Sequence, residues 1–107
     1  MGAQQIIEQV IPQRVQAKPA VQQSINGLVV FDLSGEGGGQ WTLDLTTSEG
    51  KVQGGSVATP KVTLLMTATD FEAMINGQLN AQQAFLTGKL KVKGDMGAAL
   101  KLGQLLA

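Results

Sequence analysis

The sequence predicts an α+β domain in which helices pack on one face of a five-stranded, predominantly antiparallel sheet. Two periodicities support this prediction. Apolar residues recur at helical spacing near the N-terminus and again after residue 68, whereas between them they alternate with polar residues. Glycine-rich turns separate the alternating segments. The length of 107 residues suits one domain with a single core, so we expect one unit over residues 1–107.

The first segment is expected to be helical. Four apolar residues at helical spacing predict an amphipathic helix over residues 3–11: Ile6, Ile7, Val10 and Ile11. Pro12 lacks an amide donor and clashes with the preceding turn, so we expect a kink there, or a stop followed by a new turn. Pro19 suits a first helical position and predicts a short helix over residues 19–25.

Four strands are expected in the middle of the chain. Residues 27–33 and 40–46 are rich in β-branched, aromatic and alternating apolar residues, and the glycine-rich turn between them predicts an antiparallel hairpin. Residues 51–56 form a short third strand, weakened by two glycines. Residues 61–67 alternate again and form the fourth strand.

The period then returns to that of helices. Thr69 and Glu72 match a capping box, which predicts a helix that ends near Gly77. Asn80 is expected to cap a second short helix that closes at Gly88. Asp95 is expected to cap a last helix of about 12 residues, roughly 18 Å long.

The fifth strand, residues 89–93, combines lysine and apolar residues in strict alternation. Three lysines would face water, whereas Leu90 and Val92 would face the core. The helix that follows is more apolar than one packing seam requires. This surplus of apolar surface, with almost no reactive side chain near it, predicts a lipid or another apolar ligand.

Composition argues against several classes of function. Eight basic and eight acidic residues cancel, so no strong field would recruit nucleic acid. The chain has no cysteine and no histidine, and no oxygen-rich metal loop, so we expect no catalytic residue, no metal and no cofactor. The acid-base candidates of a small enzyme would be Asp32, Asp44 and Asp70, and none has a partner at useful spacing. With no signal peptide or membrane span, a cytoplasmic protein is expected.

One long segment carries a family resemblance. Residues 79–102, LNAQQAFLTGKLKVKGDMGAALKL, resemble the signature of the sterol carrier protein 2 family. Shorter matches precede it at residues 70–71, at residues 76–79 and in the strand over residues 41–45. The order of predicted elements also agrees with that family.

The resemblance implies an apolar tunnel between the helices and the sheet that takes a fatty acid, a fatty acyl-CoA or a sterol. It implies that the protein binds and transfers its ligand without catalysis. Carried over by position, ligand contacts would come from Gln82, Phe85, Met96 and Leu100. The strand alternation and the apolar stripe of the helix after residue 68 add five predicted contacts: Phe31, Trp41, Phe71, Met74 and Ile75.

Other interpretations stay open. The aromatic and methionine side chains could simply fill a core, and the fold could serve as a non-catalytic interaction or dimerisation module. Lys89, Lys91 and Lys93 are expected to form a solvated strand face that protects a sheet edge. A second hypothesis gives them, with Lys101, the attraction of anionic headgroups or of CoA phosphates. The predicted partners are therefore the lipid ligand, a transient membrane contact and an enzyme that uses the lipid.

Overall fold

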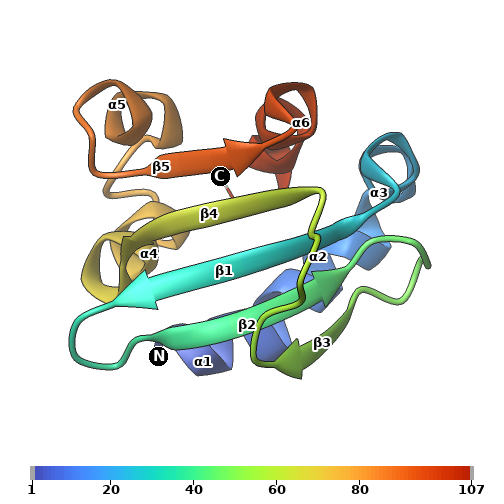
Figure 1. Cartoon of the computed structure of the whole chain (residues 1–107), viewed down its shortest axis with the longest axis horizontal. Helices are drawn as coiled ribbons and strands as arrows, with labels where there is room; N and C mark the ends of the chain where they lie inside the picture. The colour runs from blue at the N-terminus through green and yellow to red at the C-terminus, as the bar shows by residue number, and fades with distance from the viewer. Residues whose placement is uncertain (1, 107) are drawn as a thin grey trace.

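A twisted sheet of five strands forms the centre of the molecule, in the order β3-β2-β1-β4-β5 (Figure 1). The computed structural model describes residues 2–106. All neighbouring strands are antiparallel except β1 and β4, which run parallel. The predicted α+β fold is confirmed, with this one parallel pair. The strands are β1 (Leu28–Ser34), β2 (Gly39–Asp44), β3 (Lys51–Gly54), β4 (Val62–Thr67) and β5 (Lys91–Gly94).

The helices cover one face of this sheet. Figure 1 shows α1 and α2 behind β1 and β2, with α4, α5 and α6 gathered around β4 and β5. The helical elements are α1 (Ala3–Gln5), the π-helical η1 (Ile6–Val10), α2 (Ile11–Ala17), α3 (Pro19–Ile25), α4 (Ala68–Ile75), α5 (Ala81–Leu86) and α6 (Met96–Leu106).

The opposite face of the sheet is crossed by the segment that joins β3 to β4 (Figure 1). Backbone and side-chain hydrogen bonds hold this segment down. Thr42 Oγ1 donates to the carbonyl oxygen of Gly55 at 2.8 Å, and the N–H of Lys61 donates to the carbonyl oxygen of Leu28 at 2.8 Å. The crossing carries the chain from the β3 edge over β2 and β1, and it lets β4 lie parallel to β1.

Pro12 does not stop the first helix. The chain stays helical from Ala3 to Ala17, and a π-helical turn over Ile6–Val10 comes directly before the proline. The N–H of Ile11 donates to the carbonyl oxygen of Ile6, five residues back. Pro12 thereby falls in the first turn of α2, where a missing amide donor costs little. Of the two predicted outcomes, the stop is wrong.

The cap of α4 differs from the prediction. Thr67 is the capping residue, and its Oγ1 accepts a hydrogen bond from the N–H of Asp70 at 3.0 Å. The predicted capping box of Thr69 and Glu72 is therefore wrong. The reason is that β4 runs directly into α4, so Thr69 already lies inside the first helical turn. The caps predicted for the two later helices are confirmed, because Asn80 Oδ1 accepts from the N–H of Gln82 and Asp95 Oδ1 from the N–H of Ala98.

The fifth strand is shorter than predicted. It begins at Lys91, because Lys89 and Leu90 belong to the turn that follows α5. The alternation nevertheless holds: the three lysines are exposed, Leu90 is buried and Val92 is partly buried.

The core lies between the sheet and the helices. Phe31 of β1 and Phe71 of α4 are fully buried and meet edge to face, with ring centroids 5.7 Å apart. Such a pair adds about 1 kcal/mol to the energy of its burial. Ile7 and Ile11 of the first helix are fully buried as well. Burial of one helix face against the sheet thus fixes α1 and α2.

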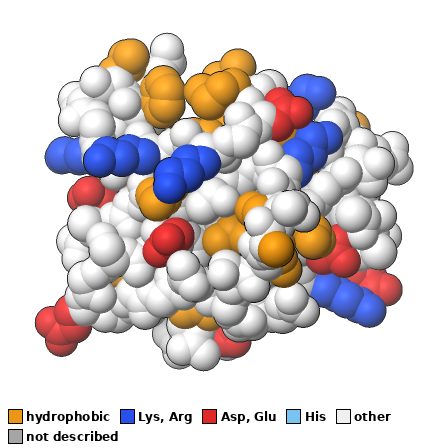
Figure 2. All heavy atoms as spheres, in the orientation of Figure 1, with side chains coloured by type: hydrophobic (Ala, Val, Ile, Leu, Met, Phe, Trp, Pro, Cys, Tyr) orange, Lys and Arg blue, Asp and Glu red, His pale blue; other side chains and the backbone are white. Residues whose placement is uncertain are grey.

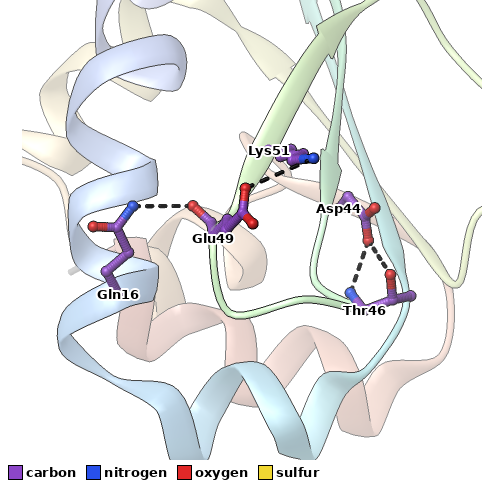
Figure 3. A network of polar contacts seen from close by, with 5 residues as sticks. All are labelled: Gln16, Asp44, Thr46, Glu49 and Lys51. Atoms are coloured by element: carbon purple, nitrogen blue, oxygen red, sulfur yellow. Dashed lines mark hydrogen bonds and ion pairs between the residues drawn. The ribbon is translucent and has the colours of Figure 1, made fainter.

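Polar contacts tie the β2–β3 turn to the first helix (Figure 3). Gln16 Nε2 donates to the carbonyl oxygen of Glu49 at 3.2 Å, and the Glu49 carboxylate pairs with Lys51 at 3.7 Å. Asp44 Oδ1 accepts from the N–H of Thr46 at 2.8 Å, a local turn of the kind that aspartate favours. These contacts are structural, and all of them lie at the β3 edge of the sheet.

Candidate functional site

A cavity of about 530 Å³ opens between α5, β5 and α6, at the other end of the sheet from β3. Cavities that bind small molecules commonly measure about 300 to 1,000 Å³ and are mostly apolar. The residues that line it are Leu64, Ala81, Gln82, Phe85, Leu86, Leu90, Val92, Met96, Ala99, Leu100, Gly103 and Leu106.

The cavity has a buried floor and an exposed rim. Leu64, Leu90 and Leu106 are buried and form its floor. The rim consists of four large apolar side chains, which are the exposed ones of this kind among residues 2–106: Phe85 (43% exposed), Leu86 (74%), Met96 (46%) and Leu100 (78%). Large apolar side chains that stay in water around a hollow mark a binding surface.

Gln82 carries the only polar side chain among the described residues that line this cavity. It stands in the first turn of α5, where its own N–H is already bonded to Asn80 Oδ1 at 2.8 Å. The side-chain amide is exposed and not engaged by that cap. It can donate to or accept from one polar group of a ligand. Chemically, the site can hold and orient an apolar molecule.

Helix α6 presents two adjacent apolar stripes to its surroundings. Ala98, Leu102 and Leu105 are buried, and the helix packs on α3, α2 and the sheet. A second set at the same i, i+4, i+7 spacing borders the cavity: Ala99, Gly103 and Leu106. The small residues of the second stripe leave room beside the helix, which is why a cavity remains there.

Two cations, Arg14 of α2 and Lys18 between α2 and α3, hold the C-terminal turn of α6. Arg14 Nη1 donates to the carbonyl oxygen of Leu105 at 3.0 Å, and Lys18 Nζ donates to that of Gln104 at 2.7 Å. The last carbonyl oxygens of a helix lack partners inside the helix, and positive charge there also suits the helix dipole. The wall of the cavity is therefore anchored from the N-terminal part of the chain.

The N-terminus of α6 is held by Asp95. The N–H of Ala98 donates to Asp95 Oδ1 at 3.0 Å and holds the pKa of that carboxyl below its ordinary value. The charges of Lys61 and Lys101 and the N–H of Gly97 act in the same direction, and partial desolvation opposes them.

Four of the nine ligand contacts predicted from the sequence meet at this cavity: Gln82, Phe85, Met96 and Leu100. The other five lie in the core and do not line it: Phe31, Trp41, Phe71, Met74 and Ile75. Phe31 and Trp41 lie on β1 and β2, which are further from the cavity than its lining strands β4 and β5. The other three residues lie on α4, which contributes no residue to the lining. For these five residues a ligand contact stays a prediction.

Sequence reasoning missed several lining residues. Leu86 was not singled out, although an apolar residue directly before a helix-ending Thr-Gly pair is a candidate for exposure. The stripe of Ala99, Gly103 and Leu106 was also missed. The i, i+4, i+7 spacing of small and apolar residues along α6 was the signal that could have revealed it.

A second hollow, of about 360 Å³, lies over β1, β4 and the start of β5 on the outer face of the sheet. Charged and apolar residues line it together: Asp32, Asp70, Lys89 and Lys91 lie beside Leu65 and Met66. The four charged side chains are at least partly exposed, so water already solvates their charges. This hollow offers an apolar molecule less apolar surface than the first cavity does.

The three aspartates named as acid-base candidates do not line the apolar cavity. Asp32 accepts a hydrogen bond from Gln40, Asp44 is occupied by Thr46, and Asp70 stands in the first turn of α4. Residues 2–106 contain no group of three or more side chains suited to a metal ion. None of the described helices has the length and hydropathy needed to cross a bilayer.

Comparison with known proteins identifies relatives of the whole chain. The model of the SCP-2 sterol transfer family matches residues 5–107. The solution structure of palmitated SCP2L2 from Aedes aegypti superposes with a TM-score of 0.79 and 29% sequence identity. That superposition covers 99% of this chain and 95% of the other.

The curated relatives are much longer proteins. "Hydroxysteroid dehydrogenase-like protein 2" of Xenopus tropicalis is 46% identical over 81 residues, which are 75% of this chain and 19% of that protein. "Peroxisomal multifunctional enzyme A" of Dictyostelium discoideum is 42% identical over 84 residues, 77% of this chain and 19% of that protein. The chain thus spans about a fifth of the length of these relatives.

Proposed function

Because the chain belongs to the SCP-2 sterol transfer family, we propose that it binds a fatty acid, a fatty acyl-CoA or a sterol in the cavity between α5, β5 and α6. One observation carries this proposal. The four large apolar side chains exposed among residues 2–106 all border the same apolar cavity. A protein that used α5 and α6 only to complete its core would have no reason to keep these side chains in water.

The size and composition of the cavity fit an alkyl chain or a sterol. Each methylene group that leaves water contributes about 0.8 kcal/mol, whereas association costs on the order of 4 to 15 kcal/mol. Burial of a long alkyl chain therefore exceeds the cost by a modest margin. The result is a moderate affinity with little selectivity for the headgroup, which suits a protein that must also release its ligand. Palmitate in the Aedes aegypti relative supports this class of ligand.

The proposed activity is binding and transfer without catalysis. The cavity wall contains Gln82 as its one described polar side chain, and an amide is neither a general acid nor a nucleophile under ordinary conditions. The enzyme-named relatives contain a region like this chain within a much longer protein. We therefore place the chain beside an enzyme that uses the lipid, to which it delivers a bound substrate.

Lipid extraction from the purified protein, followed by mass spectrometry, tests the proposal. We expect a bound lipid, and we expect fatty acid, acyl-CoA and sterol each to displace a fluorescent fatty acid from the cavity. Absence of both results would reject lipid binding. It would select the second candidate, an interaction or dimerisation module, which the exposed side chains of Leu86 and Leu100 also favour.

The cytoplasm is the compartment proposed for this activity. The alternative is the peroxisome, which stands in the name of the Dictyostelium discoideum relative. A fluorescent fusion of the chain in its own cells, compared with a peroxisomal marker, decides between the two compartments.

A further inference from the structure

We infer that the end of the molecule formed by α5, β5 and α6 docks directly on an anionic phospholipid bilayer, with the rim of the cavity against the membrane. The inference rests on the proposed function and deepens it by naming the surface from which the lipid enters. Two independent features of this end carry it: an exposed apolar rim and an excess of lysine.

The apolar rim projects from α5 and α6. Leu86 is 74% exposed at the end of α5, and Leu100 is 78% exposed on α6. In Figure 2 orange side chains stand out at the surface over α5 and α6, at the top of the view. A lipid that passes between this rim and a bilayer would stay in contact with apolar groups throughout, whereas any other route leads through water.

The charge of the chain is divided unevenly along its length. Residues 79–107 hold four lysines and one carboxylate, Asp95, whereas residues 1–78 hold four basic and seven acidic residues. Counted along the chain, residues 79–107 therefore have an excess of three positive charges and residues 1–78 an excess of three negative ones. Such a charge distribution turns the cavity end toward an anionic surface.

The lysines lie beside the rim and do not line the cavity: those of β5 are on the opposite face of the strand from Val92, which does line it. Lys91 and Lys93 point outward from the edge strand β5, and Lys89 lies in the turn between α5 and β5. Lys101 is exposed on α6, one residue beyond Leu100. Figure 2 shows blue side chains directly below the orange ones, over β5. They form no ion pair with any of the residues 2–106.

Three carboxylates lie near these lysines and limit the positive field. Asp32 and Asp70 line the hollow that Lys89 and Lys91 also line, and Asp95 caps α6 close to Lys101. Lys93 does not line that hollow. Lys93 and Lys101 therefore remain, on either side of Asp95, as exposed lysines outside that hollow.

Neither feature alone would hold a protein on a membrane. A few exposed apolar side chains give marginal, reversible binding, and a basic patch adds attraction to anionic lipid only within about a Debye length of the surface. Together they predict weak binding that falls as salt rises. A carrier needs this behaviour, because it must leave the membrane after loading.

Vesicle sedimentation with two matched variants tests the electrostatic part. The variant K89Q/K91Q/K93Q, called the rim variant, removes three positive charges from β5 and the turn before it, beside the rim. The control S48E/K51Q/Q53E lowers the net charge by the same amount at exposed positions near β3, the opposite edge of the sheet. Vesicles of phosphatidylcholine mixed with phosphatidylserine should bind the rim variant at least about tenfold more weakly than they bind the wild type. The control variant should bind as wild type does, and vesicles of phosphatidylcholine alone should bind all three equally.

A site-specific label tests the orientation. The chain has no cysteine, so L86C and Q53C each provide one labelling site for a fluorophore. Lipids brominated in their acyl chains should quench the label at position 86 and leave the label at position 53 unchanged. Quenching at both positions, or at position 53 alone, would overturn the proposed orientation.

Failure of docking and failure of lipid binding can be told apart. Binding of a neutral pyrene-labelled long-chain alcohol in solution, without vesicles, reports on the cavity alone, and the K89Q/K91Q/K93Q variant should retain it. If the wild type does not bind the alcohol, the proposed function is rejected, whereas the conclusion from vesicle binding still holds. Equal vesicle binding by the two charge variants, or none by the wild type, would reject the docking surface and assign the rim to a protein partner.

Discussion

Arg14 on α2 donates a hydrogen bond of 3.0 Å to the carbonyl oxygen of Leu105 on α6, 91 residues further along the chain. Its second terminal nitrogen lies 3.5 Å from the carbonyl oxygen of Ile75, at the end of α4. One guanidinium thus joins the C-terminal turns of two helices to the first helical segment. The cavity wall depends on this contact, because the next residue, Leu106, forms part of the floor.

Replacement of Arg14 should therefore loosen α6. Hydrogen bonds to a charged group contribute about 1.5 to 3 kcal/mol, so Arg14→Ala should lower the free energy of unfolding by about 2 kcal/mol in urea titrations. Amide hydrogen exchange should increase most in the last turn of α6. The exposed neighbour variant Gln13→Ala is the control, and an equal loss in both variants would contradict the role given to Arg14.

Gly103 offers a test of the cavity that separates binding from stability. It lies in α6 and lines the cavity, and a Cβ added there meets no atom within 4 Å. Gly103→Ala should raise the free energy of unfolding by about 1 kcal/mol, because glycine is a poor helix former, and should keep ligand affinity. Gly103→Leu should be at least as stable as wild type and should lose affinity, since its side chain fills the space for the ligand. Full affinity of the leucine variant in a displacement titration would place the ligand elsewhere.

Asp95 should make the stability of the protein depend on acid pH. Its pKa in the folded protein lies below the ordinary value of 3.8, chiefly because of the Ala98 N–H. A group with a lowered pKa stabilises the fold above its unfolded pKa and loses that contribution as the pH falls through the folded one. Asp95→Asn keeps a capping side chain but removes the charge.

The melting temperature of Asp95→Asn should therefore lie below that of the wild type at pH values above 3.8, and the two should converge as the pH falls further. Glu36→Gln, in an exposed loop, controls for the loss of one negative charge. A difference between Asp95→Asn and wild type that grows on acidification would have the wrong sign for this mechanism.

The cap of α4 can be assigned by two threonine variants. Thr67→Ala should cost about 1 kcal/mol of unfolding free energy, because the hydroxyl that accepts from the Asp70 N–H is lost. Thr69→Ala should be neutral or slightly stabilising, since Thr69 stands within the helix, where alanine is the better residue. Chemical denaturation of both variants measures the two effects. If Thr69→Ala were the less stable variant, Thr69 would be the capping residue after all.

Local patterns predicted most of the elements correctly. The alternation of lysine with Leu90 and Val92 identified the edge strand, and Asn80 and Asp95 identified the starts of α5 and α6. Each of these signals depends only on residues a few positions apart, so the element it marks can be predicted from the sequence alone. Thr69 shows the limit of this reasoning. The sequence predicted the cap at Thr69, whereas the pairing of β4 with β1 extends to Thr67, and Thr67 is the cap.

Four of the twelve residues that line the cavity were predicted from the sequence as ligand contacts. Gln82, Phe85, Met96 and Leu100 were identified from the family signature, and they meet at the cavity because α5 and α6 flank the edge strand β5. Phe31 and Trp41 face the helices, as their alternation predicted, but they lie on β1 and β2 and are buried in the core. Strand order decides which inward-facing residues reach a cavity, and period-2 alternation does not encode strand order.

Taken by itself, the sequence determined the kinds of elements, the caps of α5 and α6, and the surplus of apolar side chains near its C-terminus. The tertiary structure decided that β1 and β4 run parallel, and that Arg14 and Lys18 hold the end of α6. It also decided that the apolar surplus surrounds an open cavity. Periodicity and capping are properties of neighbouring residues, whereas a cavity exists only where distant segments meet and leave space between them.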